Sequence, residues 1–352
     1  MREFLQAKGL DAFVFSRRSS FAWLTDGGES SVDEASEVGA ADLILTPERA
    51  YVVAPNNEMD RLMEEVLGDQ GYEPVTYSWR EDRISIIEKL LHGRATGSDI
   101  LLPGCREFYR EVKTLRYALL PGEQERMRFL GKETARIVGE VCRQIRPGDS
   151  EIKIAATIKG NLAGEGIAAP VILVAADGRI AKYRHPVPTN KEVEHLVMVV
   201  VCARRWGLTV ALTRMVYFGS VPQDLKQRFT LVNAISARLI NATTPGKEVK
   251  EIFYQAMQAY TEVGYPGEWE KHHQGGPIGY DTRDYLAYPE CEGIVYEGQG
   301  FAWNPILVEV KSEDTILALA GGSEIITIDE KWPAEVFVRG ETIVRRPGIL
   351  LL

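Results

Sequence analysis

The chain has 352 residues, of which 26% are charged, and a formal net charge of −9. A chain of this length is expected to form two domains. The excess of acidic residues argues against nucleic-acid binding, which depends on clustered Lys and Arg that neutralise phosphates. The opening residues lack the apolar core of a signal peptide, and no apolar run is long enough to span a bilayer. We therefore expect a cytoplasmic protein that does not enter a membrane.

The first part of the chain, residues 1–115, alternates strand-like and helix-like segments. Short strands are predicted over residues 10–15, 41–46 and 50–54, and a helix is predicted over 58–68 from its apolar spacing. Such alternation favours an α/β domain with helices packed on a mixed sheet. The segment contains no GxGxxG fingerprint, so dinucleotide binding is not supported. We interpret it as a structural or dimer-forming domain.

An internal repeat organises the second part, residues 116–352. A helical stripe over residues 127–145 stops at Pro147-Gly148, and a further stripe over 225–239 stops at Pro245-Gly246. Each stop is followed by a second helix and then by strands. Pro245 follows Pro147 by 98 residues, which is too long for a solenoid repeat. We expect two related α+β halves that share one sheet, with a site where the halves meet.

A glycine-rich segment, residues 270–284, stands out as the wall of a small-molecule site. It contains two of the five histidines, His272 and His273, followed by three glycines and a proline that exclude a helix. Tyr280 and Arg283 follow within side-chain reach of a ligand. Because neighbouring residues on an extended segment point to opposite faces, only one of the two histidines is expected to enter the site.

These features resemble the creatinase, aminopeptidase P and prolidase superfamily over nearly the whole chain. Residues 20–27 are similar to a strand-turn segment of its N-terminal domain, and the duplicated halves are similar to its catalytic domain. The resemblance implies an α/β N-terminal domain over residues 1–115. It further implies an α+β pita-bread domain with an internal pseudo-twofold over residues 116–352, a homodimer, and a small-molecule or short-peptide substrate.

Metal-dependent members of this superfamily hold two ions with two Asp, one His and two Glu. The matching positions can be located from nearby landmark residues. They are Val200 (from Gly207), Ala211 (from Thr213-Arg214), Gly276 (from Ile278-Gly279), Asn304 (from Pro305) and Glu313 (from Asp314). Of the five ligands only the glutamate remains, whereas a dinuclear site needs carboxylates to bridge the ions and offset their charge. We therefore predict no metal and no cofactor.

Three polar residues that the resemblance retains are predicted to be catalytic. His185 matches a substrate-binding His of the family and is predicted to be a general acid/base, since imidazole titrates near neutral pH. The alternative is a histidine in a surface turn beside Pro186. His272 matches a second family His and is expected to assist through hydrogen bonds. Glu313 would orient a histidine or accept a ligand ammonium, or would form a buried ion pair.

Other polar and aromatic residues near these motifs are predicted to bind substrate. Arg283 and Lys311 suit an anionic group, although structural ion pairs with nearby carboxylates explain them equally well. Cys202 lies in an apolar strand, which raises a thiol pKa and argues against a nucleophile. The remaining candidates for substrate binding are Asn304, Trp303, Tyr280 and His273.

Three functions follow from this resemblance. The first is a metal-independent, creatinase-like hydrolase or lyase acting on a C–N bond of a small amino-acid-like or peptide-like compound. Creatinase is a metal-free relative that hydrolyses such a bond with a histidine as general acid/base. The second is a non-catalytic pseudo-peptidase that binds a peptide or a small ligand. The third is a Xaa-Pro aminopeptidase or dipeptidase whose metal has moved to His272, His273 and Glu313.

Overall fold

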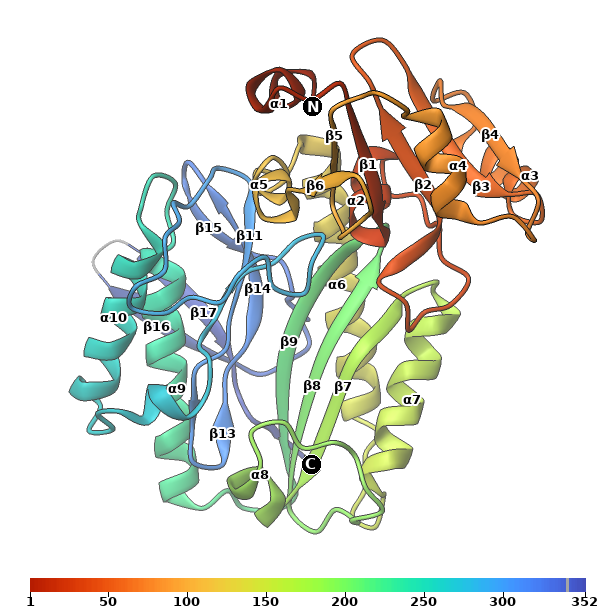
Figure 1. Ribbon diagram of the computed structural model, residues 1–352. Helices are drawn as coiled ribbons and strands as arrows, with labels where there is room; N and C mark the ends of the chain where they lie inside the picture. The colour runs from red at the N-terminus through yellow and green to blue at the C-terminus, as the bar shows by residue number, and fades with distance from the viewer. Residues whose placement is uncertain (340–341) are drawn as a thin grey trace. The chain divides into compact units, whose positions relative to one another are not determined.

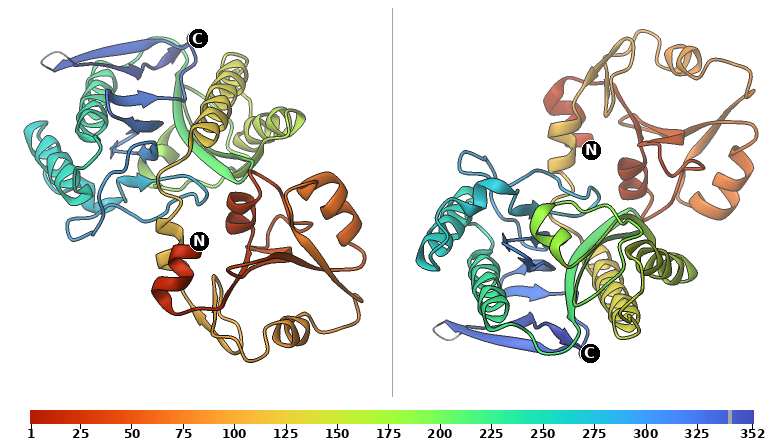
Figure 2. Two further views of the ribbon diagram at one scale, coloured as in Figure 1. Left: turned by 90° about the horizontal axis from the view of Figure 1, so that it is seen from above. Right: turned by 90° about the horizontal axis from the view of Figure 1, so that it is seen from below.

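The structure is a computed structural model that describes residues 1–339 and 342–352. The described chain divides into two compact units, Met1–Arg116 and Tyr117–Leu352 (Figures 1 and 2). Each unit has a hydrophobic core of its own. Within the described residues, no helix combines the length and the apolar character that a transmembrane segment needs.

The first unit is built on a six-stranded mixed sheet in the order β4-β3-β2-β1-β5-β6. Phe13 and Phe15 of the central strand belong to one core cluster, whereas Ala12 and Val14 belong to another. Since successive strand residues point to opposite faces, both faces of the sheet are covered. The strands are β1 (Ala12–Arg17), β2 (Val38–Leu45), β3 (Ala50–Pro55), β4 (Glu73–Tyr77), β5 (Thr96–Ser98) and β6 (Cys105–Glu107).

The helices of the first unit are short. The predicted helix over 58–68 is present, but it changes from α-helix to π-helix at Leu62. The helical segments are α1 (Arg2–Lys8), α2 (Arg18–Leu24), α3 (Met59–Arg61) with its π-helical continuation η1 (Leu62–Leu67), α4 (Arg83–Leu90) and α5 (Tyr109–Thr114).

The second unit contains two four-stranded sheets, ordered β18-β9-β8-β7 and β10-β11-β14-β15. The expectation of one shared sheet is therefore wrong. The sheets meet at β9 and β14, where the Thr213 amide donates to the Glu313 carbonyl at 3.0 Å and the Ala211 amide donates to Thr315 Oγ1 at 2.7 Å. These contacts involve one backbone bond and one side-chain acceptor, so they connect the two sheets without forming a continuous ladder.

The strands of the second unit differ widely in length. Two further pairs, β12-β13 and β16-β17, stand outside the four-stranded sheets. The strands are β7 (Ala168–Ala176), β8 (Leu196–Arg205), β9 (Leu208–Tyr217), β10 (Gly275–Pro277), β11 (Gln299–Trp303), β12 (Ile306–Leu307), β13 (Val310–Lys311), β14 (Asp314–Leu319), β15 (Gly322–Ile325), β16 (Ala334–Arg339), β17 (Thr342–Pro347) and β18 (Leu350–Leu351).

The predicted duplication is visible in the helices and in the turns that follow them. Helices α6 (Pro121–Cys142) and α7 (Glu151–Gly164) pack beside the β7–β9 sheet, and α9 (Gln223–Ala242) and α10 (Val249–Glu262) form the corresponding pair in the other half (Figure 1). Gly148 and Gly246 both adopt positive φ, at 90° and 86°. The amide of Gly148 donates to the Val193 carbonyl, and that of Gly246 donates to the Val295 carbonyl. The two halves thus repeat the same helix-stop geometry.

Candidate functional site

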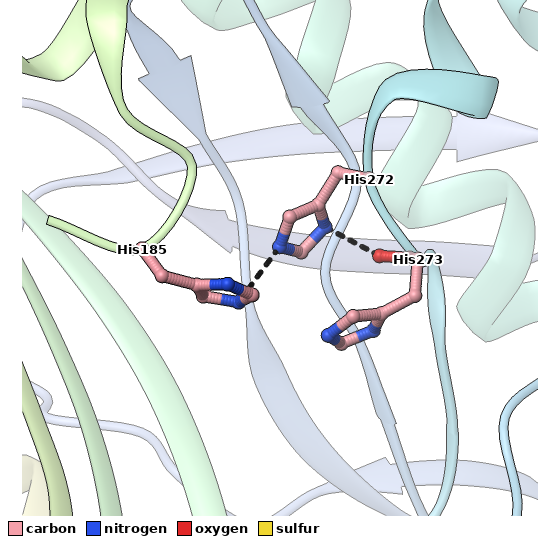
Figure 3. Close-up of side chains that lie close together, drawn as sticks. All are labelled: His185, His272 and His273. Carbon is pink, nitrogen blue, oxygen red and sulfur yellow. Dashed lines mark hydrogen bonds between the residues drawn. The ribbon is translucent and has the colours of Figure 1, made fainter.

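Three histidines of the second unit come together at one point (Figure 3). His185 lies in the loop after α8 (Gly178–Lys182), while His272 and His273 lie between the short 3-10 helix η2 (Glu268–Lys271) and β10. One ring nitrogen from each histidine lies within 4.8 Å of the others. The loop after α8 belongs to the first half of the repeat and His272 to the second, so the two halves do meet here.

His272 and His273 both belong to this cluster, which corrects the expectation that only one would enter it. Their rings stack with centroids 4.3 Å apart and an interplanar angle of 25°. The alternation of faces applies to a regular strand, whereas this pair follows the end of a 3-10 helix and precedes β10. At such a junction, the sequence pattern does not determine to which side each histidine side chain points.

The hydrogen bonds define which ring nitrogens carry protons. His272 Nδ1 lies 2.5 Å from the carbonyl oxygen of His273, and a carbonyl can only accept, so Nδ1 carries the hydrogen. In the neutral ring, His272 Nε2 then carries the lone pair. It lies 3.2 Å from His185 Nε2, which must donate (Figure 3). The lone pair of neutral His185 therefore lies on Nδ1.

All three imidazoles are held in the neutral form at neutral pH. Burial, followed by the charge of Lys311, lowers the pKa of His272 to about 3. Burial, followed by the charge of Arg283, lowers the pKa of His273 to about 4. The pKa of His185 is also lowered, by burial and by Lys311, although this residue is the most exposed of the three.

Gln274 positions the backbone around His272. Its Nε2 donates to the His272 carbonyl at 2.6 Å and to the Trp269 carbonyl at 3.0 Å. Its Oε1 accepts from the hydroxyl of Tyr260 at 2.8 Å, and this hydroxyl is also 3.1 Å from the carbonyl of Ile306. Gln274 is fully buried, so we assign it a structural role in holding the histidine segment.

Glu313, Lys311 and Arg283 form a second cluster, which we call the charged trio. Glu313 Oε2 lies 3.0 Å from Lys311 Nζ, and Oε1 lies 3.0 Å from Arg283 Nη2. Thr213 Oγ1 donates to Oε2 at 3.0 Å. Burial alone would raise the pKa of Glu313, but Lys311 and Arg283 outweigh it and lower this pKa to about 2. Both cations therefore form the ion pairs that the sequence left open as the alternative to substrate binding, with Glu313 as the common partner.

The charged trio carries a net charge of +1 in a buried setting. Lys311 is 3% exposed, and within the described residues its ammonium forms an ion pair with Glu313 alone. Arg283 Nε and Asn304 Oδ1 are also buried, and neither has a hydrogen-bond partner in the part of the chain that the structure describes. Buried polar groups are normally satisfied, so the unmatched Arg283 donor and the positive charge suit an anionic group of a ligand, and the unmatched Asn304 acceptor suits a donor group.

Two predicted substrate-binding residues instead have structural partners. Trp303 is 1% exposed, packs in the main core of the unit, and donates from Nε1 to Thr243 Oγ1 at 2.8 Å. Tyr280 donates to Glu123 Oε1 at 2.6 Å, and burial followed by the Glu123 charge raises its pKa. The structure thus places Trp303 in the core and gives the Tyr280 hydroxyl a protein partner, although both were predicted to bind substrate.

Cys202 lies near the charged trio but has the electrostatics of an inert thiol. It is unpaired, and burial followed by the charge of Glu313 raises its pKa to about 11. Thr213 is a contact that the sequence interpretation missed, because the Thr213-Arg214 pair served only to locate Ala211. The signal that could have found it is the Thr213 hydroxyl, which lies two residues after Ala211, one of the lost ligand positions.

The described residues do not fit the family's two-ion centre. Val200 and Ala211 are buried core residues without donor atoms. Gly276 has φ of 149°, and a Cβ there would lie 2.6 Å from the Tyr285 carbonyl oxygen, so the backbone closes the position of the ligand histidine. Glu313 is already engaged by Lys311 and Arg283. The donor set and the local charge are both wrong for two bridged divalent ions.

Comparisons with known proteins identify the family. Residues 125–329, which are 205 of the 352 residues, match metallopeptidase family M24. An uncharacterized peptidase of Staphylococcus aureus (strain MRSA252) is 28% identical over 126 residues, and one of Staphylococcus saprophyticus is 28% identical over the same length. Each match spans 34% of this chain and 36% of the relative, about a third of the curated protein.

Solved structures with similar folds extend over almost the entire chain. A Xaa-Pro dipeptidase from Bacillus anthracis has a TM-score of 0.80 at 19% identity, covering 100% of this chain and 98% of its own. The prolidase from Pyrococcus furiosus has a TM-score of 0.80 at 18% identity, and the match covers 94% of this chain and 100% of the prolidase. The N-terminal domain of the FACT complex subunit SPT16 from chickpea has a TM-score of 0.70 at 11% identity, and the match covers 93% of this chain and 92% of that domain. These likenesses confirm the predicted pita-bread fold, and with the family match they establish that the chain belongs to metallopeptidase family M24.

Proposed function

We propose that this chain hydrolyses a C–N bond in a small compound that carries a carboxylate, without a metal ion and with His185 as general acid/base. The observation that carries the proposal is the His185–His272 pair, in which the His273 carbonyl determines the proton positions of both rings. A histidine oriented by a hydrogen bond from a second group is a recurring arrangement in general acid–base catalysis.

The proposed reaction adds water across the C–N bond. Nδ1 of His185 takes a proton from water while the water oxygen bonds to the carbon. The protonated His185 then gives that proton to the departing nitrogen, and the C–N bond breaks. His272 remains neutral and keeps accepting from His185 Nε2, so the general base returns to its starting tautomer.

The charged trio supports a carboxylate on the substrate. Its net charge of +1 is buried, and a ligand carboxylate would neutralise it and accept from Lys311 and Arg283. Positive charge beside the histidines also favours the neutral imidazole that a general base requires. The same charge disfavours a substrate whose reacting end is cationic.

The decisive experiment measures turnover of metal-stripped protein in excess chelator. Candidate substrates are Xaa-Pro dipeptides and N-acyl amino acids, with product formation followed by proton NMR. We expect at least one compound to be consumed in the chelator, and His185→Ala to reduce kcat by roughly 10²–10⁴-fold. His195→Ala is the matched control, because His195 is exposed and stacks on Tyr217 at 6.3 Å, outside the cluster.

Two results would contradict this function. One is turnover that appears only after Mn²⁺ or Co²⁺ is added. The other is a His185→Ala protein whose kcat equals that of the wild type on a compound that is consumed.

A second candidate function is ligand binding without turnover. It is favoured by the loss of family ligand positions and by the engagement of Glu313 with two cations. One similar structure is a domain of a complex subunit, so the fold is compatible with such a role. A compound from the same set that raises the melting temperature by mass action, yet remains unconsumed, would support this candidate instead.

A further inference from the structure

The histidine cluster has a property that the proposed reaction does not use. Three imidazoles from two separate segments present ring nitrogens within 4.8 Å of one another. Three histidines form a known ligand set for a divalent ion with an open fourth position. His185 and His273 do not occupy any of the five family ligand positions, and His272 lies four residues before the one at Gly276.

The spacing of the cluster is close to that of a tetrahedral metal site. Metal–nitrogen bonds of about 2.0–2.1 Å place two ligand nitrogens about 3.4 Å apart in tetrahedral geometry. His185 Nε2 and His272 Nε2 are 3.2 Å apart, which matches this spacing. Other pairs are separated by up to 4.8 Å, so closure needs a shift of about 1.4 Å. His185 is exposed on a loop and can supply that movement by side-chain rotation.

Two independent observations also point to a bound ligand. His272 donates its Nδ1 hydrogen to a backbone carbonyl at 2.5 Å, which directs the Nε2 lone pair toward the cluster. Metal-bound histidines usually make this kind of outer contact, because it determines the tautomer and strengthens the donor nitrogen. His273 Nδ1 is buried and has no hydrogen-bond partner within residues 1–339 and 342–352. An unsatisfied buried nitrogen beside two other imidazoles requires an explanation.

We propose that His185, His272 and His273 bind one divalent transition-metal ion of the Zn²⁺, Co²⁺ and Ni²⁺ class, at a mononuclear site separate from the family's two-ion centre. Imidazole nitrogen suits these ions, whereas Mg²⁺ and Ca²⁺ prefer oxygen. The bound ion takes the His272 lone pair that otherwise accepts from His185, and His185 binds it through Nε2 in the other tautomer, with its hydrogen on Nδ1. Ion binding and the proposed metal-independent reaction therefore exclude each other.

The charged trio tunes this site in a predictable direction. Lys311 and Arg283 act electrostatically on the histidines, and Glu313 offsets only one of the two positive charges. Their net charge of +1 weakens the binding of a cation and favours an anion as its fourth ligand. Lys311→Met removes one positive charge, so it should bind Co²⁺ more tightly than the wild type. Mere structural damage would weaken binding instead.

The test is a Co²⁺ titration of the full-length, tag-free, metal-stripped protein. Visible d–d absorption reports four-coordinate Co²⁺, and competition with Zn²⁺ gives the relative affinity. We expect one ion per chain. His185→Ala and His272→Ala should each weaken binding by roughly 100-fold or more, because outer-contact losses alone cost 10–100-fold. His195→Ala, which changes an exposed histidine outside the cluster, should bind like the wild type.

The readout separates this proposal from the proposed function, because absorbance reports binding whether or not any substrate is consumed. The metal proposal is wrong if the wild type binds no Co²⁺, if both His→Ala variants bind it like the wild type, or if Lys311→Met weakens it. His185→Ala changes an exposed loop residue, so it remains informative if His272→Ala fails to fold. If turnover instead requires the ion bound at these histidines, the metal site stands and the metal-independent reaction fails.

Discussion

At the scale of single residues, Lys311 distinguishes this site most clearly from a two-ion peptidase centre. In such a centre, carboxylates offset the charge of the metal ions. Here the retained Glu313 offsets an ammonium and a guanidinium, which the protein supplies from its own chain. The carboxylate of Glu313 is therefore neutralised by side chains and leaves a net charge of +1, and the imidazoles remain available for proton transfer or for a single ion.

Glu313 should stabilise the protein above about pH 4.5 and lose this effect in acid. Its pKa is about 2 in the folded state against 4.5 ordinarily, so the folded state favours the ionised form. The stabilisation is fully present above the unfolded pKa and disappears as the pH falls from 4.5 toward 2, with a total of roughly 3 kcal/mol. Urea unfolding of wild type and Glu313→Gln should differ more at pH 7 than at pH 3.

Glu297→Gln is the control for this comparison, because Glu297 is an exposed glutamate in the same unit. It should change the unfolding free energy little at either pH. A Glu313→Gln deficit that is the same at pH 3 and pH 7 would show that ionisation of Glu313 contributes nothing.

At the scale of elements, the space beside Gly276 in the glycine-rich segment is filled by backbone atoms rather than by side chains. A Cβ at Gly276 would lie 2.6 Å from the Tyr285 carbonyl oxygen and 3.1 Å from the Ala287 amide, and its φ of 149° disfavours other residues. Gly276→Ala should therefore lower the free energy of unfolding by about 2 kcal/mol. Gly279→Ala is the matched control in the same segment, since its Cβ would meet only Asp284 Oδ2 at 3.8 Å.

Urea unfolding of the two glycine variants separates these positions directly. Equal loss of stability in both would mean that the segment relaxes around a new methyl group. It would also reopen the possibility of building a ligand side chain at position 276.

The elements themselves were largely readable from the sequence, whereas junctions between them were not. Apolar periodicity and the Pro-Gly stops predicted the paired helices of both halves, because these signals are local. At the turn between β8 and β9, Trp206 and Gly207 both adopt the positive φ that a two-residue hairpin needs. The stacking of His272 on His273 depends on how a 3-10 helix leads into a short strand, and no residue pattern encodes that direction.

For the whole molecule, the sequence predicted the fold class but not the number of sheets. The 98-residue offset indicated a duplication, and the two halves do repeat. The sheets nevertheless remain separate, because β9 and β14 are joined partly through the Thr315 side chain instead of a continuous ladder. Long-range contacts of this kind also determine the site, where Glu313 meets Thr213 across 100 residues of sequence. A local pattern cannot specify such a pairing.

The two units should respond separately to the same core substitution. Phe15 is fully buried in a core cluster of the first unit, and Phe229, on α9, is 2% exposed in the main core of the second. Phe→Leu at either position removes ring contacts and should cost about 1–2 kcal/mol. Hydrogen exchange of the whole chain is the measurement, because slow exchange reflects the stability of the cooperative unit that contains each amide. Exchange should accelerate in residues 1–116 for Phe15→Leu and in residues 117–352 for Phe229→Leu. Equal acceleration throughout the chain in both variants would mean that the separate cores unfold as one, and the histidine cluster would then depend on the packing of the first unit as much as on its own.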